Sequence, residues 1–216
     1  MDGNRRWAKD RGLPTIEGHR QGYETLKACV SWAEEAGVEN IIVYAFSTEN
    51  LKRRAEEEVS YLMQLIRFAV EKQLSDMLKK GVRIRFLGQW ELLPEDIQKH
   101  MRSIEDKSKN NTNLTLGIAL SYGGRAEVVA AIKKLPTESL QNITEENFSN
   151  YLWTSGIPDP DLIIRTGGAK RLSNFLPWQS VYSELYFTDT YWPAFSKEEF
   201  IQALDQFAGT KRNFGA

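Results

Sequence analysis

The chain has 216 residues, of which 41% are hydrophobic and 26% are charged, and its formal net charge is −1. This length and composition predict one globular α/β domain, spanning residues 1–216, with a substantial core. The balanced charge argues against a nucleic-acid partner, because general nucleic-acid binders present a broad basic field. The single cysteine, Cys29, cannot form an internal disulfide, so a reducing cytoplasm is the expected location. Since no apolar run approaches the roughly 18 residues of a membrane span, any membrane contact is expected to be peripheral.

Helical segments and apolar strands are expected to alternate along the chain. Gly37 and Gly81 are placed to end helices, and Pro94 is placed to open one. Such alternation predicts a mostly parallel sheet flanked by helices, and Ser47, Ser121 and Thr166 would follow its strands at one edge. In chain order, the expected elements are a helix at 19–36, a strand at 40–46, a helix at 57–80, a strand at 82–87, a helix at 94–109, a strand at 114–120, helices at 124–135 and 145–152, strands at 161–165 and 184–188, and a helix at 197–207.

The first candidate phosphate site opens the chain. Asp2 and Gly3 lead into Asn4-Arg5-Arg6-Trp7-Ala8, followed by Gly18 and His19. A glycine before a helix lets the backbone approach an anion, and the helix N-terminus attracts negative charge. Asp2 offers an oxygen ligand for a hard cation, although a simple helix cap would also explain it. His19 is equally compatible with a structural histidine.

The second candidate site follows the expected strand at 161–165. It comprises Arg165-Thr166-Gly167-Gly168-Ala169-Lys170-Arg171-Leu172-Ser173-Asn174-Phe175, with Glu184 further on. Arginine donates two hydrogen bonds at once to phosphate, and the glycines are expected to leave backbone N–H groups available as donors. A glycine turn with surface arginines is the simpler alternative. Two such segments in one chain favour binding of diphosphates.

These motifs, together with Ser47-Thr48-Glu49-Asn50 and Tyr122-Gly123-Gly124-Arg125, occur in one order along the chain. In this set and order the sequence resembles the cis-prenyltransferases of the undecaprenyl diphosphate synthase type, from Asp2 to about Gly215. The resemblance implies their fold and a Mg²⁺-dependent condensation of isopentenyl diphosphate with an allylic prenyl diphosphate. The product would be a Z-polyprenyl diphosphate, with diphosphate released.

The resemblance also implies roles for individual residues. Asp2 and Asn50 would be catalytic, with Asn50 an orienting group or relay rather than a base. Mg²⁺ would be held by Asp2 and Glu184, with Glu184 supplied either by the same chain or by a partner subunit. The substrate-binding residues would be Gly3, Asn4, Arg5, Arg6, Trp7, His19, Ser47, Thr48, Glu49, Arg53, Arg165, Arg171, Leu172 and Ser173.

A homodimer is also implied by the resemblance, and an aromatic-rich stretch at 182–195 suits an interface or a core. The apolar residues of the helix at 57–80 cover more than one face, which suits either core packing or a tunnel for a prenyl chain. Ala45, at a strand end, suggests a medium or long product.

Several positions depart from the family pattern, namely Thr15, Leu51, Arg54, Ala169 and Asn213. Relatives also carry a strand before the Asp-Gly-Asn motif, so truncation of the N-terminus is expected. Two alternatives remain open. One is a non-catalytic scaffold subunit of a heteromeric cis-prenyltransferase, and the other is a phosphoryl-ligand binding module.

Overall fold

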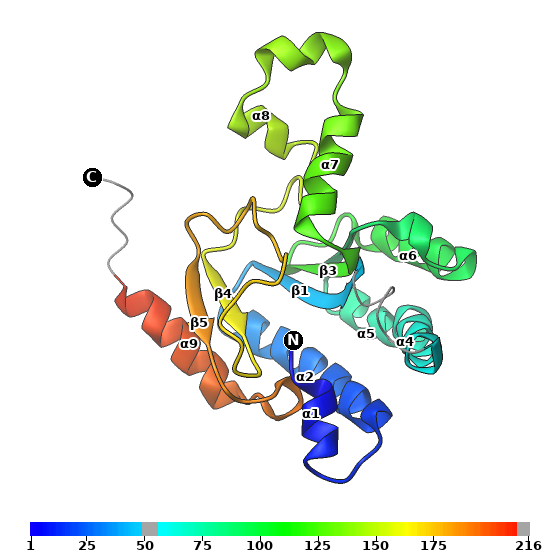
Figure 1. Ribbon diagram of the computed structural model, residues 1–216, viewed down its shortest axis with the longest axis vertical. Helices are drawn as coiled ribbons and strands as arrows, with labels where there is room; N and C mark the ends of the chain where they lie inside the picture. The colour runs from blue at the N-terminus through cyan, green and yellow to red at the C-terminus, as the bar shows by residue number, and fades with distance from the viewer. Residues whose placement is uncertain (49–55, 211–216) are drawn as a thin grey trace. The chain divides into compact units, whose positions relative to one another are not determined.

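Two parallel sheets organise the chain, each in its own structural unit (Figure 1). The computed structural model describes residues 1–48 and 56–210. The first unit comprises Met1–Trp32, Pro160–Arg171 and the chain from Gln179 onward, and the second comprises Ala33–Asp159 and Leu172–Trp178. The predicted α/β class with parallel strands is confirmed. The expectation of a single domain stays a prediction.

The first unit is built around β4 (Leu162–Arg165) and β5 (Glu184–Phe187), which pair in parallel. The register sets Leu162 opposite Glu184 and Arg165 opposite Phe187. Phe200 of its last helix is buried and lies 6.2 Å from the ring of Trp32. The helical elements of this unit are α1 (Asn4–Lys9), most of α2 (Thr15–Glu35), the 3₁₀ turn η4 (Trp192–Ala194) and α9 (Lys197–Gly209).

The second unit contains the larger sheet, in the strand order β1-β3-β2. Its central strand β3 is almost wholly buried, as expected for a parallel strand covered on both faces. The strands are β1 (Asn40–Ser47), β2 (Val82–Leu87) and β3 (Leu114–Tyr122). The helical elements are α4 (Glu56–Phe68), η1 (Ala69–Gln73), α5 (Leu74–Lys79), η2 (Trp90–Leu92), α6 (Glu95–Ser108), α7 (Gly124–Lys134), η3 (Thr137–Asn142) and α8 (Glu145–Ser149).

Two local irregularities were not predicted. The long helix expected at 57–80 is present over 56–79, but five π-helical residues, η1, separate its α-helical parts α4 and α5. In β1 the register shifts between Tyr44 and Phe46, so Ala45 has no partner on β3 and is exposed. A bulge of this kind bends the end of the strand.

The core of the second unit joins the ends of its strands to the segment at 172–178. Leu87, Ala119 and Tyr122 pack with Ile157 and Leu176 in one buried cluster. The segment at 172–178 is therefore fixed against the carboxyl ends of β2 and β3. No helix among the described residues is long and apolar enough to cross a membrane.

Candidate active site

The backbone of Asp2 is fixed at the carboxyl end of β4. The Thr166 hydroxyl accepts a hydrogen bond from the Asp2 N–H at 3.0 Å and donates one to the Asp2 carbonyl at 2.9 Å. The Trp192 N–H donates to the same carbonyl, also at 2.9 Å. Because Thr166 directly follows β4, the strand places Asp2 beside Arg165.

The Asp2 carboxylate contacts two arginines and one amide. Its Oδ1 accepts the Gly3 N–H at 2.7 Å and lies 3.4 Å from Arg6 Nη2, while its Oδ2 accepts a hydrogen bond from Arg165 Nη2 at 3.1 Å. Partial burial alone would raise the pKa of Asp2. The hydrogen bond from Arg165, the charges of both arginines and the Gly3 amide outweigh burial, so this pKa lies below its usual value. Two positive groups and one negative group leave a net charge of +1, which suits an anionic ligand.

Arg6 links the N-terminal segment to the turn after β4. Its Nη1 donates to the Gly167 carbonyl at 2.8 Å, and its guanidinium lies 5.1 Å from the centre of the Tyr191 ring. A Cβ at Gly167 would come within 2.8 Å of Arg6 Nη2, and one at Gly3 within 2.7 Å of the Tyr191 ring. Both glycines have positive φ, so close approach and backbone conformation both favour glycine here.

The two glycine N–H groups of the turn after β4, which were predicted to bind an anion, already donate to backbone carbonyls. The Gly167 N–H donates to the Thr190 carbonyl at 2.8 Å and the Gly168 N–H to the Thr188 carbonyl at 2.9 Å. The expectation that this turn offers free glycine amides is therefore wrong at these two positions. Near Asp2, the remaining backbone donors are the first N–H groups of α1, which have no acceptor within the helix.

The helix α1 is held close to α2 by two glycines. A Cβ at Gly18 would lie 2.0 Å from the Asn4 carbonyl oxygen, and one at Gly22 would lie 2.1 Å from Asn4 Oδ1. His19, next to Gly18, is only 9% exposed. Trp7 is half-buried, with the Arg11 guanidinium 4.4 Å from the centre of its ring. The packing of α1 against α2 thus sets the position of the N-terminal phosphate segment.

In the second unit, the expected residues gather at the carboxyl ends of β1 and β3. Ser47 ends β1 opposite Tyr122. A Cβ at Gly123 would lie 3.1 Å from Thr48 Oγ1 and 2.9 Å from Asn174 Nδ2. The segment that carries Ser173 therefore approaches the residues that follow β1. Ser47 and Ser121 lie at the ends of neighbouring strands of one sheet, as expected, whereas the expectation that Thr166 belongs to the same sheet edge is wrong, because Thr166 follows β4 of the other sheet.

The remaining expected residues divide into exposed ones and ones beyond the described ranges. Arg5, Arg171 and Ser173 are exposed and Leu172 is half-buried, so these side chains are accessible to a ligand. The Arg171 carbonyl also accepts a hydrogen bond from Arg165 Nη1. The predictions for Glu49, Asn50, Arg53, Leu51, Arg54 and Asn213 fall outside the described residues.

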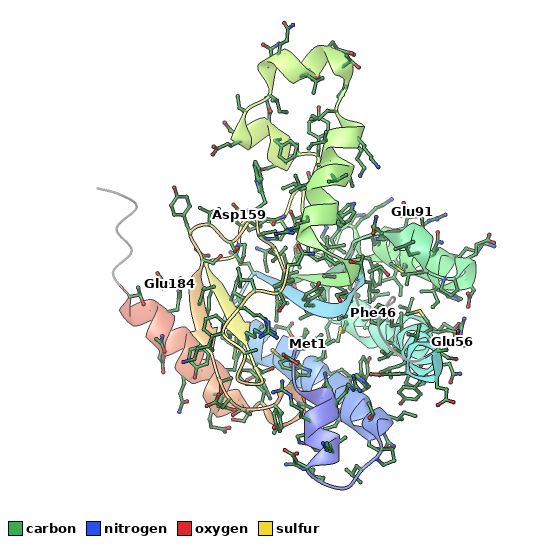
Figure 2. All side chains as sticks on the ribbon, viewed as in Figure 1. Met1, Phe46, Glu56, Glu91, Asp159 and Glu184 are labelled. Atoms are coloured by element: carbon green, nitrogen blue, oxygen red, sulfur yellow. The ribbon has the colours of Figure 1, made fainter. Side chains whose placement is uncertain are left out.

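The two proposed magnesium ligands lie at opposite ends of the β4–β5 ladder. Asp2 contacts Arg165 at the carboxyl end of β4, whereas Glu184 starts β5 opposite Leu162, three positions or about 10 Å away. Figure 2 shows Glu184 well apart from Met1. Among residues 1–48 and 56–210 there is no group of three or more His, Cys, Asp or Glu side chains that could hold a metal. A single carboxylate still fits Mg²⁺, which commonly takes one or two carboxylates plus substrate phosphates.

The roles of two residues at this site were not predicted from the sequence. Thr166 belongs to the second candidate segment, but the two hydrogen bonds between its hydroxyl and the Asp2 backbone were not predicted. Tyr191, which packs on Gly3 and Arg6, lies in the aromatic-rich stretch for which either an interface or a core was predicted. Its place after Thr190, whose carbonyl pairs with Gly167, could be found only from the fold.

An α/β fold with paired arginines and an aspartate at a strand end suits an enzyme that acts on a phosphorylated substrate. The family model for the undecaprenyl diphosphate synthases matches residues 1–215, and the chain belongs to this family. It is a cis-prenyltransferase, as predicted from its motifs.

The relatives and solved structures agree on this membership. The isoprenyl transferase of Aquifex pyrophilus is 46% identical over 215 residues, covering 100% of this chain and 93% of the relative. That of Thermotoga maritima is 45% identical, covering 100% of this chain and 94% of the relative.

The crystal structure of lavandulyl diphosphate synthase from Lavandula x intermedia, in complex with dimethylallyl diphosphate, is similar with a TM-score of 0.95. It is 31% identical and covers 100% of this chain and 95% of that one. A probable undecaprenyl diphosphate synthase from Campylobacter jejuni has a TM-score of 0.81 at 33% identity, covering 91% of this chain and 93% of that one.

Proposed function

We propose that this enzyme condenses isopentenyl diphosphate with an allylic prenyl diphosphate, forms a Z-polyprenyl diphosphate and releases diphosphate. The observation that carries the proposal is the Asp2, Arg6 and Arg165 cluster beside the start of α1. It presents a net positive charge and helix N–H groups at one place, which is what a diphosphate leaving group requires.

The allylic diphosphate binds along residues 3–6. As its C–O bond breaks, negative charge grows on the leaving diphosphate, and Arg6 and the first N–H groups of α1 stabilise that charge. The contacts of Arg6 with Gly167 and Tyr191 hold its guanidinium in place before the reaction. Preorganised charge lowers the barrier because no reorganisation is needed during bond cleavage.

Isopentenyl diphosphate is assigned to Arg165, Arg171, Leu172 and Ser173. Exposure of Arg171 and Ser173 supports this assignment. After the new C–C bond forms, a proton must leave the isopentenyl unit. By family resemblance Asn50 orients this step, a phosphate oxygen accepts the proton, and His19 helps to carry it, while Ser47, Thr48, Glu49 and Arg53 lie near the reacting carbons.

Mg²⁺ would be held by Asp2 together with substrate phosphates, and when bound it would neutralise phosphate charge. The low pKa of Asp2 supports this role, because the ligand must be ionised. Glu184 would contribute only from another copy, since Asp2 and Glu184 of one chain lie at opposite ends of the ladder.

The proposed assembly is a homodimer, with peripheral membrane contact and a cytoplasmic location as further expectations. Tyr182 and Leu185, together with the preceding Val181, are exposed apolar side chains and support an interface at the start of the stretch at 182–195. Trp192 and Phe195 are buried within the first unit, so core packing accounts for the other end.

A matched pair of variants tests the role of Asp2. Asp2→Ala should reduce incorporation of isopentenyl diphosphate on the order of 100-fold, because it removes the proposed metal ligand and the carboxylate that accepts a hydrogen bond from Arg165. Asp10→Ala, at an exposed position just after α1, should retain activity. Equal activity of the two variants would refute the proposed site.

A further inference from the structure

The segment that carries Ser173 has an unusual backbone. Among residues 1–48 and 56–210, positive φ outside glycine occurs at Ser121 (47°), Ser173 (50°), Asn174 (65°) and Leu176 (48°). Three of these four residues lie within 173–176. Left-handed conformations are unfavourable for side chains other than glycine, and they persist only where surrounding contacts enforce them.

Asn174 provides contacts of this kind. Its Oδ1 accepts the Arg125 N–H at 2.9 Å, and its carbonyl oxygen accepts the Gly124 N–H at 2.8 Å. The residue preceding α7, Gly123, makes no side-chain cap. Asn174 therefore caps the start of α7 from a distant part of the sequence, and asparagine is also one of the few residues that tolerate a left-handed backbone.

The residues after Asn174 are packed on the second unit's core. The Phe175 ring stacks on Tyr44 with centroids 4.9 Å apart, and Leu176 is only 1% exposed. A Cβ at Gly124 would lie 2.0 Å from Pro177 Cδ, so α7 and this segment are in close contact. Ser173 is exposed beside this anchored stretch. The backbone conformation at Ser173 is consequently constrained by the neighbouring Asn174.

We propose that Asn174 is a positioning residue for isopentenyl diphosphate. By bonding both Gly124 and Arg125, it holds the left-handed turn that presents the Ser173 hydroxyl to the second diphosphate. This inference rests on the proposed function, which assigns that diphosphate to Ser173. Removal of the Asn174 side chain would delete the bond from Arg125 and leave only the backbone bond from Gly124, so the turn at 173 would be held less firmly and the hydroxyl would be presented less precisely.

Three substitutions of Asn174 distinguish the effect of losing its side-chain hydrogen bond from the effect of changing its backbone conformation. Asn174→Ala removes the side-chain amide and disfavours the left-handed turn, whereas Asn174→Gly removes the side-chain amide but still permits that turn. Asn174→Asp keeps an acceptor oxygen at the same distance. Asn147→Ala is the matched control, because Asn147 Oδ1 likewise accepts a backbone N–H, that of Thr144 at 2.8 Å, at the start of α8.

The readouts are the KM for each substrate, kcat, and calorimetric titration with isopentenyl diphosphate. Asn174→Ala and Asn174→Gly should raise the KM and Kd for isopentenyl diphosphate about tenfold, with less than a twofold change in the KM for the allylic substrate. Asn174→Asp should raise them less than Asn174→Ala, and Asn147→Ala should resemble the wild type.

Two results would overturn the inference. One is unchanged Kd for isopentenyl diphosphate in Asn174→Ala and Asn174→Gly. The other is an equal rise in KM for both substrates, which would indicate a general loss of structure. Failure of the wild type itself to bind isopentenyl diphosphate would instead refute the proposed function, so the two ideas fail separately.

Discussion

The close contact between α1 and α2 gives a prediction that links packing to catalysis. In Gly18→Ala the new Cβ would lie 2.0 Å from the Asn4 carbonyl oxygen, about 1.4 Å short of the 3.4 Å at which ordinary contact begins. The obstacle is backbone, so no side-chain rotation relieves it. The helix α1, with the N–H groups proposed to bind the allylic diphosphate, must move by roughly that distance.

The expected magnitudes differ for stability and for activity. Overpacking costs about 1–3 kcal/mol, and alanine regains about 1 kcal/mol of helix propensity, so net destabilisation should be about 0–2 kcal/mol. For a chain of this length, an unfolding entropy of about 2.1 cal/mol/K per residue makes that a fall in Tm of at most about 4 °C. A misplacement of about 1 Å in a preorganised site lowers the catalytic rate on the order of 100-fold. We therefore expect a large fall in kcat/KM for Gly18→Ala although its Tm changes little.

The assay is incorporation of isopentenyl diphosphate at a temperature well below the Tm, with Tm measured by circular dichroism. Gly209→Ala is the control, since a Cβ there meets no atom within 4 Å. Retention of full kcat/KM by Gly18→Ala, or an equal loss in Gly209→Ala, would refute the reasoning.

Three further predictions concern single side chains. The lowered pKa of Asp2 stabilises the fold above the unfolded pKa of this carboxyl, and that contribution is lost as the pH falls through the folded value. Asp2→Asn should therefore flatten the acid limb of Tm against pH, whereas a curve parallel to that of the wild type would contradict this. Cys29 is 5% exposed and burial raises its pKa to about 12, so a thiol reagent at pH 8 should label it only after denaturation; stoichiometric labelling of the folded protein would count against it. Ala45→Leu should shorten the products, because Ala45 is exposed at the bulged end of β1, and an unchanged product ladder would exclude this placement of the tunnel.

The sequence was informative where a local pattern decides the structure. The expected strand at 82–87 has the observed bounds of β2, because its alternation of arginines with apolar residues is local. Pro94 opens α6 as expected. The π-helical residues of η1 were not predicted, since Ala69 and Val70 continue the apolar pattern without a break.

The site was predictable in its residue types but not in its hydrogen bonds. Asp2, Arg6 and Arg165 were selected because aspartate and arginine suit metal and phosphate chemistry, and the structure places them together. The glycine amides after Arg165 were assigned to an anion, but they pair with the carbonyls of Thr188 and Thr190. That pairing depends on the path of the chain at Thr188 and Thr190, far along the sequence from the two glycines, and no local motif contains this information.

The central claim is that this chain transfers prenyl groups onto isopentenyl diphosphate. It is tested most directly by incubating the purified protein with Mg²⁺, radiolabelled isopentenyl diphosphate and an allylic diphosphate of ten, fifteen or twenty carbons, with product length read by chromatography. The account predicts a discrete ladder of Z-polyprenyl diphosphates that disappears on chelation of the metal. Binding of both diphosphates without incorporation of label would contradict it.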